Sequence, residues 1–432
     1  MIPLAVCFVV ALLFQTAAAD QRLTLQEALH LAERNHPALA AARSLIAPAQ
    51  ANLVEARAAL WHNPELSMEV RHRELAQRES DDLTEHDAAV GLTQTFEIAG
   101  QPRARRAAAE ASLEASRYAV DQTRFEVRLE VATEFVDALQ LRRRLEAEQA
   151  SAELFHQAAD IIAKRVKAGE DTRLDANIAL VEAERASTQV MQTGDELARA
   201  RAKLAATLQL PPNVLPEPFG TLTETGPSYR LRELLGSVAR HPRIQATTAR
   251  VLAARHQLTL ERAARIPDVT LGLTYSPERT LDGTDEITTL SVNVPLPFFR
   301  NNDPAIAQAN AELMQSESAL QSAQRDTEAA IRVLWQRLTK LRQQKARLEG
   351  IVLPILQDTQ RLSLAAMRAG EINVTEFLLA RRQTIEAQRE LADAQAQAVV
   401  VRLELENAAG WEKGGAPPNG QQNFPIRTKE SP

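Results

Sequence analysis

Two near-identical turns in the sequence are each followed by an acidic residue at the matching position. The turns are Lys167-Ala168-Gly169-Glu170 and Arg368-Ala369-Gly370-Glu371, and the acidic residues are Asp175 and Glu376. Carboxylates that symmetry brings close together create a negative potential, which attracts cations and raises the carboxyl pKa values. The alternative is that both lie on solvated helix faces, as most charged side chains of long helices do. Asp175 and Glu376 are therefore the residues whose type and position favour an attraction of cations.

The other polar residues form no pattern typical of an enzyme or a metal centre. His36 and His241 precede prolines in a repeated motif, which favours a structural role. The remaining histidines lack a ligand spacing such as H-x3-H; they are His30, His62, His72, His86, His156 and His256. The motifs G-x-S-x-G, Walker A, H-E-x-x-H and G-x-G-x-x-G do not occur. The sequence therefore predicts no catalytic site, no cofactor and no resident metal ion.

The composition favours long helices. Only 15 glycines and 4% aromatic residues occur in 432 residues, whereas Ala, Glu, Gln, Arg and Leu are abundant. A net charge of −6 excludes the concentrated basic surface of a nucleic-acid-binding protein. The single cysteine excludes a disulfide scaffold. A mean hydropathy of −0.26 argues against a bundle of membrane-spanning helices, but membrane β-strands alternate and hardly raise this value.

The N-terminus has the features of a secretory signal peptide. Residues 2–13 form an apolar run too short to span a bilayer as a helix. Ala17 and Ala19 then form an A-x-A cleavage site, and we expect cleavage before Asp20. Cys7 would be removed with this segment, which predicts an exported, cysteine-free protein without a lipid anchor. A buried N-terminal helix is the alternative.

The chain contains an internal duplication. The stretch that begins at Leu25 recurs from Leu231, so that His36-Pro37 matches His241-Pro242. In each copy a helical stretch ends at a proline and is followed by apolar and polar residues in alternation, which predicts a β-hairpin with a polar loop, around 79–86 and 276–286. We expect five segments: a signal peptide (1–19), a first repeat (20–209), a Pro-rich linker (210–227), a second repeat (228–410) and a disordered tail (411–432).

A long helical pattern follows each predicted hairpin. Residues 103–166 contain no proline or glycine, and apolar residues recur every seven positions at Val131, Ala138, Leu145, Ala152, Ala159 and Val166. The second copy has such a column at Ile306, Leu313, Leu320, Thr327, Leu334, Leu341, Leu348, Ile355 and Leu362. This period predicts helices packed along their length as in coiled coils. Pro354 should kink the second helix. Return helices are expected over 173–208 and 374–409.

Four strands per chain are too few to form a membrane barrel. A closed barrel needs at least eight strands, and an open edge leaves backbone groups unsatisfied in lipid. If the strands span a membrane, two or three chains must therefore share one barrel. Phe96, Phe298 and Phe299 lie at strand ends, where aromatic residues mark the membrane interface. The alternative is a soluble hairpin that caps a helical bundle.

The order of helix, hairpin, long helix, glycine turn and return helix, present twice over residues 21–410, resembles the TolC family of outer-membrane efflux proteins. The resemblance implies a mainly α fold with a small β part. It implies a homotrimer with four membrane strands and four long antiparallel coiled-coil helices per protomer, forming a 12-stranded β-barrel and a 12-helix periplasmic α-barrel. It also implies contact with outer-membrane lipid and partners of two kinds, a periplasmic adaptor (membrane fusion protein) and an inner-membrane RND-type pump.

Two segments resemble the cation-efflux (cobalt–zinc–cadmium resistance, CzcC-like) branch of that family. Residues 94–103, QTFEIAGQPR, are similar to its Q-x-x-E-x-G-G-K-R stretch, with Ala99 and Gln101-Pro102 as departures. Residues 295–302, PLPFFRNN, are similar to its P-L-P-x-F-x-R-N, and Asn63-Pro64-Glu65-Leu66 fits as well. The resemblance implies that the cargo is divalent heavy-metal cations.

The resemblance also assigns roles to the two turns. They correspond to the periplasmic tips that meet the adaptor, so the predicted adaptor contacts are Lys167, Ala168, Gly169, Glu170, Asp171, Thr172, Arg173, Leu174, Arg368, Ala369, Gly370, Glu371, Ile372, Asn373, Val374 and Thr375. Asp175 and Glu376 match acidic residues near the tunnel aperture of TolC proteins, whereas Leu379 replaces a second acidic residue there. Any helical hairpin needs a glycine turn, which is the simpler explanation of the repeat.

We therefore expect a non-enzymatic exit duct in the outer membrane with a long periplasmic extension, through which cargo diffuses passively. The alternatives are a soluble periplasmic coiled-coil adaptor or structural protein, and a duct for drugs or for polypeptides of type I secretion. No nucleic acid is expected as a partner.

Overall fold

The computed structural model describes residues 22–75, 83–211, 213–221, 228–280, 283–299, 301–369 and 371–411. The expected signal peptide, residues 412–432 of the expected tail, and Gly370 lie outside the described residues, as does the side chain of Arg368. The described chain forms two compact units. We call them the strand-bearing unit (residues 41–122 and 242–325) and the helical unit (residues 22–40, 123–241 and 326–411). Each unit contains segments of both repeats.

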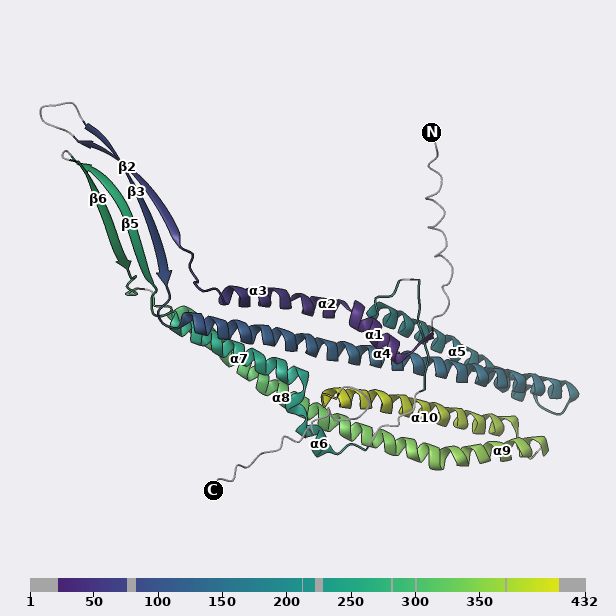
Figure 1. Ribbon diagram of the computed structural model, residues 1–432. Helices are drawn as coiled ribbons and strands as arrows, with labels where there is room; N and C mark the ends of the chain where they lie inside the picture. Colours follow the sequence, from purple (N-terminus) through teal and green to yellow (C-terminus); the bar gives the residue numbers. More distant parts are fainter. Residues whose placement is uncertain are drawn as a thin grey trace, which may run out of the picture. The chain divides into compact units, whose positions relative to one another are not determined.

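The strand-bearing unit contains one antiparallel sheet of four strands (Figure 1). The strands are β2 (Glu65–Leu75), β3 (Leu83–Phe96), β5 (Val269–Thr280) and β6 (Gly283–Asn293), in the order β2-β3-β5-β6. Both predicted hairpins are present, and β3 pairs with β5 to join the two repeats. The loop predicted over 276–286 is wrong in extent. Most of these residues belong to β5 and β6, because the two strands stay paired as far as Thr280 and Gly283 although the side chains there are polar.

The register gives the sheet two chemically different faces. On one face Leu66, Leu92, Leu273 and Leu290 lie side by side across the four strands. On the other face Ser67, Gly91, Thr274 and Thr289 form the neighbouring row. The apolar side chains are exposed within the single chain, with Leu66 and Leu290 at 70% and 74%. The sheet therefore presents an uncovered apolar face and a face of small polar groups.

Helices flank this sheet in the sequence. The unit holds α3 (Ile46–Ala56) and α7 (Pro242–Ala263), together with the first turns of α4 (Gln101–Ala168) and α8 (Asp303–Arg347). Ala49 and Leu53 of α3 pack against Leu113 of α4 in a small buried cluster.

The helical unit is built from long antiparallel helices. It contains α1 (Leu25–Asn35), the rest of α4, α5 (Arg173–Thr207), the short α6 (Leu231–Gly236), the rest of α8, α9 (Leu353–Ala369) and α10 (Val374–Ala408). Its core joins α1, α4, α5 and α10 through buried residues that include Ala32, Val131, Phe135, Leu204 and Ala396. Within the predicted linker, β4 (Glu217–Pro218) pairs in parallel with β1 (Arg22–Leu23). Among the described residues we find no helix with both the length and the apolarity needed to cross a membrane.

The second long helix is interrupted where the sequence predicted a kink. Residues Leu348–Val352 form a π-helical turn just before Pro354 and separate α8 from α9. The predicted seven-residue column is buried or half-buried as far as Leu348, but Ile355 and Leu362 are exposed at 61% and 59%. The column is therefore wrong beyond Leu348, because a π-helical turn holds about one extra residue and rotates everything after it.

Candidate functional site

The polar face of the sheet carries small side chains in some rows and charged side chains in another. Gly91 lies between Ser67 and Thr274, and a Cβ atom added to it would be 2.6 Å from the Ser67 Oγ. Gly272 repeats this arrangement, with its added Cβ 2.5 Å from the Ser291 Oγ. The close approach occurs once in each repeat. A larger residue at either glycine would require the neighbouring serine side chain to move, so these rows hold only small side chains.

The charged row lies nearer the hairpin turns. Arg71 pairs in register with Asp87, and Glu278 pairs with Asp285. An Arg71 guanidinium nitrogen lies 3.6 Å from a Glu278 carboxylate oxygen, which places these two pairs on the same face. The row contains three carboxylates and one guanidinium, so its formal charge is negative.

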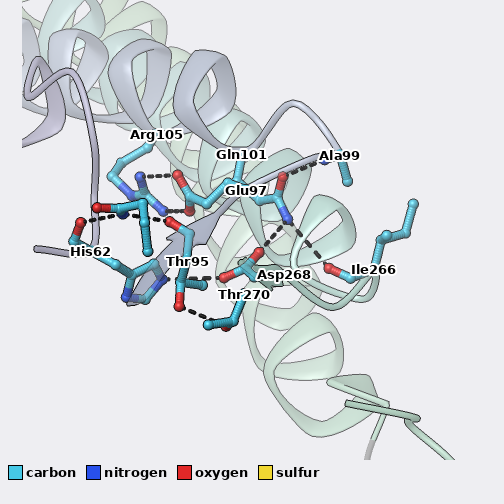
Figure 2. A network of polar contacts seen from close by, with 10 residues as sticks. His62, Thr95, Glu97, Ala99, Gln101, Arg105, Ile266, Asp268 and Thr270 are labelled. Atoms are coloured by element: carbon cyan, nitrogen blue, oxygen red, sulfur yellow. Dashed lines mark hydrogen bonds and ion pairs between the residues drawn. The ribbon is translucent and has the colours of Figure 1, made fainter. Parts of the chain in front are cut away.

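A polar network forms where strands change to helices in the strand-bearing unit (Figure 2). We define the junction network as His62, Gln94, Thr95, Glu97, Gln101, Arg105, Asp268 and Thr270. The first six belong to the first repeat and the last two to the second repeat. His62 Nε2 lies 3.2 Å from a carboxylate oxygen of Asp268, and the hydroxyl groups of Thr95 and Thr270 are 2.8 Å apart. The network thus joins the two repeats at one point.

Gln101 is the central residue of the junction network. Its side chain is 2% exposed at the first position of α4. Its amide nitrogen donates to the carbonyl of Ile266 (3.3 Å) and to Asp268 (3.1 Å), and its amide oxygen accepts the backbone N–H of Ala99 (2.6 Å). A buried amide with all these partners fixes the path of the chain into α4.

An ion pair beside Gln101 fixes the next turn of α4. Arg105 forms a two-point contact with the buried carboxylate of Glu97, the geometry in which an arginine binds most strongly. The same guanidinium lies 3.7 Å from the ring centre of Trp61, which adds a cation–π contact. Gln94 completes the network by donating to the carbonyls of His62 and Thr95, both at 2.8 Å.

This geometry explains the segment 94–103 singled out in the sequence. Gln94, Glu97 and Gln101 all bind groups of their own chain. The second segment behaves similarly, because Asn302 adopts a φ of +60° and donates to the carbonyl and the carboxylate of Glu261. Both segments therefore have a structural explanation that does not involve cargo.

The first predicted tip consists of two helices joined by a short turn. Gly169 ends α4 with a φ of +79°, and the N–H groups of Gly169 and Glu170 donate to the carbonyls of Val166 (3.1 Å) and Arg165 (3.0 Å). This is a Schellman ending, in which glycine adopts the left-handed conformation without steric cost. Arg165 also contacts Asp171, with 2.8 Å between its Nε and a carboxylate oxygen.

The two aperture candidates differ in what their carboxylates do. Asp175 forms a capping box with Thr172: it accepts the Thr172 N–H at 3.2 Å and the hydroxyl at 2.6 Å, and its own N–H donates to that hydroxyl. In the second turn Asn373 caps α10 by accepting the N–H of Glu376 at 2.8 Å. The side chain of Glu376 is exposed, as is Leu379 at 46%. Asp175 is thus bound to its own helix start, whereas Glu376 projects from its helix.

One backbone hydrogen bond of the first turn has a counterpart among the described residues of the second. The Glu371 N–H donates to the carbonyl of Ala366 at 2.9 Å, as that of Glu170 does to Arg165. The structure also brings both turns to one end of the helical unit, because one buried cluster contains Phe155 and Ile162 of α4, Ala179 and Ala183 of α5, and Val374 and Leu378 of α10. The adaptor-contact role of the turns stays a prediction.

Two buried glutamates of α4 were not singled out in the sequence. Glu148 is 2% exposed and contacts Arg144 (2.9 Å), Arg389 of α10 (3.3 Å) and the hydroxyl of Thr193 on α5. Glu134 is 5% exposed and lies 3.3 Å from Lys203 of α5. Both occupy the fourth position of the heptad counted from Val131, where apolar residues are the rule. A charged residue at this inward heptad position is the sequence feature by which both glutamates could have been identified.

The predicted interface aromatics are exposed. Phe96 ends β3 on the apolar face, and Phe298 and Phe299, after β6, are 79% and 100% exposed. Trp61, before β2, is 42% exposed and was not selected from the sequence, although it lies beside the strand-starting Asn63-Pro64. Their contact with lipid stays a prediction. The described residues include no group of three or more His, Cys, Asp or Glu side chains arranged to hold a metal ion.

A family model described as "Outer membrane efflux protein" matches residues 28–208 and 237–411. The chain belongs to the outer membrane efflux protein family. The predicted resemblance, the mainly helical channel fold, the outer-membrane location and the absence of enzymatic activity are confirmed by this membership. The two matched segments correspond closely to the two repeats seen in the sequence.

Individual members of this efflux family give a finer comparison. The "Cobalt-zinc-cadmium resistance protein CzcC" of Cupriavidus metallidurans is 24% identical over 366 residues, covering 84% of each chain. The "Pyoverdine export outer membrane protein OpmQ" of Pseudomonas putida is 25% identical, covering 68% of this chain and 65% of its own. The crystal structure of the outer membrane protein VceC of Vibrio cholerae shares the fold, with a TM-score of 0.74, 19% identity, and coverage of 90% of this chain and 96% of VceC.

Proposed function

We propose that this outer membrane efflux channel is the exit duct of a tripartite system that passes divalent heavy-metal cations out of the cell. Three copies would share one barrel of twelve strands, continued by their long helices. A periplasmic adaptor would bind the two turns of each copy, and an inner-membrane pump of the RND type would supply the energy. Cargo would move passively through the water-filled lumen.

The observation that supports the duct proposal is the sheet with one apolar and one polar face. Its apolar face is exposed within the single chain, and β2 and β6 each pair with one neighbour in the described part of the chain. Edge-to-edge pairing of copies in lipid would account for both features. The apolar face would then contact acyl chains, and the backbone groups of the edge strands would be hydrogen-bonded. The polar face would then surround water.

Two observations support cations as cargo. The charged row holds Asp87, Glu278 and Asp285 against Arg71 alone, so a trimer would carry a ring with an excess of negative charge. Such rings favour cations over anions. The likeness to CzcC points the same way. The likeness to OpmQ, whose description concerns pyoverdine, supports an organic cargo as the second candidate.

The experiment is a deletion strain tested against zinc, cobalt and cadmium salts and against a panel of drugs, with the gene restored on a plasmid. We expect greater sensitivity to the metal salts, reversed by the plasmid. Equal metal sensitivity with and without the gene would remove the cation proposal, and sensitivity to organic compounds alone would favour the second candidate.

The purified channel tests the charged row directly. In planar bilayers under a salt gradient, we expect the double variant Glu278→Gln/Asp285→Asn to lose part of the cation preference seen in the unmodified channel. Glu286→Gln is the matched control, since Glu286 pairs with Pro277 on the opposite face of the same hairpin. An equal reversal potential for all three proteins would contradict a role of the row in selectivity.

A further inference from the structure

A cavity of about 470 Å³ lies in the helical unit between α1, α4 and α10. Its walls are mainly apolar and include Leu25, Leu29, Phe125, Leu129, Leu403 and Trp411. Two of these residues are aromatic, and Trp411 is the last residue of the chain that the structure describes. Neither turn, sheet face nor junction network contributes to this cavity.

The polar groups of the cavity are unequally satisfied. The indole N–H of Trp411, a residue only 8% exposed, has no hydrogen-bond partner among the described residues, and the same holds for the buried Nε of Arg402. The Glu406 carboxylate accepts a hydrogen bond from the hydroxyl of Tyr229 and lies 3.9 Å from the Nε of Arg402. A buried donor without a partner costs about 1–3 kcal/mol. Both donors are enclosed by protein, so the wall offers a ligand mainly apolar surface, and the ligand should bring apolar groups.

The chain itself continues from this wall. Residues 412–432 follow Trp411 directly, and they contain the apolar tripeptide Phe424-Pro425-Ile426 among polar residues. Proline has no N–H of its own, so a buried proline leaves no backbone donor of its own without a partner. Aromatic-lined grooves are a common way to bind proline-containing segments. The thirteen residues from Trp411 to Phe424 can span up to about 43 Å, so the tripeptide can reach the cavity.

We propose that the C-terminal segment Phe424-Pro425-Ile426 binds in this cavity through contacts of its apolar side chains with the wall. A tether of this length holds its end at an effective concentration on the order of 1 mM. Even a weak contact would therefore be populated within one chain. The bound segment would tie the end of α10 to α1 and α4.

The test uses the full-length channel in lipid nanodiscs, which keep free detergent out of an apolar cavity. We compare tryptophan emission and acrylamide quenching between the unmodified protein and Phe424→Ala/Ile426→Ala. Trp61 and Trp335 are the same in both proteins, so a difference reports Trp411. We expect red-shifted emission and stronger quenching in the variant. The matched control is Gln421→Ala/Gln422→Ala, which should behave like the unmodified protein.

A peptide titration supplies the second arm. A chain ending at Trp411 should show the emission of the Phe424→Ala/Ile426→Ala variant, and a synthetic peptide of residues 419–432 should restore the original emission with a Kd on the order of 1 mM. Equal emission and quenching of the unmodified protein and Phe424→Ala/Ile426→Ala would overturn the proposal. It would also be overturned if Gln421→Ala/Gln422→Ala had the same effect.

Discussion

Replacing Gly169 by valine should impair export without disturbing assembly of the channel. Gly169 ends α4 with a φ of +79°, and an added Cβ atom would meet no heavy atom within 4 Å. The substitution therefore adds backbone strain and no clash. The left-handed backbone conformation costs a residue with a Cβ atom roughly 1–2 kcal/mol of free energy, and a β-branched residue lies at the upper end of this range.

This strain is small beside the stability of a folded protein, which is about 5–15 kcal/mol. It is large for one turn, because 1–2 kcal/mol changes a local equilibrium by a factor of roughly 5–30. If the adaptor binds only the native turn, its apparent affinity falls in proportion to the fraction of turns that keep that shape. We therefore expect a loss in adaptor affinity of up to about 30-fold, and a loss of resistance with it.

The assay measures resistance to the exported compound in cells, trimer content on native gels, and adaptor binding to the purified channel. Gly169→Asn is the first control, since asparagine tolerates the left-handed conformation. Gly194→Val is the second, because Gly194 lies inside α5 with nothing within 4 Å of its added Cβ and no positive φ. Full resistance and unchanged adaptor binding in Gly169→Val would refute the reasoning, and so would an equal loss in either control.

Three further changes follow from buried or capping groups. Glu148→Ala should lower the free energy of unfolding by about 1–3 kcal/mol, because it leaves the partly exposed Arg144 and Arg389 without their buried carboxylate. Glu146→Ala, an exposed neighbour, is the control in a denaturant titration. Gln101→Leu should cost about 1–3 kcal/mol for each stranded partner and lower the thermal midpoint, whereas an unchanged midpoint would contradict the role given to the junction network. The N–H and hydroxyl of Thr24 lower the pKa of Glu27 below 4.5, so its stabilisation is present above that pH and is lost as pH falls. Glu27→Gln should therefore melt earlier than the unmodified protein at pH 7, and the difference should shrink below pH 4.5; a constant difference would speak against it.

The elements were predictable because their patterns are local and long. Residues 103–166 lack proline and glycine, and they form one helix from Gln101 to Ala168. The alternation after Pro64 and Pro267 gives the strands. The seven-residue column was followed correctly to Leu348 and failed beyond it. A proline predicts a kink in the helix. The seven-residue spacing of apolar residues does not show whether the helix bends there or gains a π-helical residue.

The site was predictable only where a short motif determines the geometry. The Gly169 turn follows from its sequence, and the T-x-x-D spacing of Thr172 and Asp175 was a readable capping signal. Glu148 could have been noticed as a charge at an inward heptad position. Gln101 and Asp268 could not be paired in advance, because 167 residues separate them and their contact depends on how the two repeats pack.

The outer edges of β2 and β6, which have no partner strand in the described part of the chain, have a genetic consequence. If each edge must pair with an identical chain, a protomer whose β6 cannot pair prevents closure of every barrel that contains it. In the proposed trimer, with equal expression of defective and normal protomers and random mixing, only about one assembly in eight contains three normal copies. Alleles that damage an edge strand should therefore be dominant, whereas alleles that abolish the whole chain should be recessive.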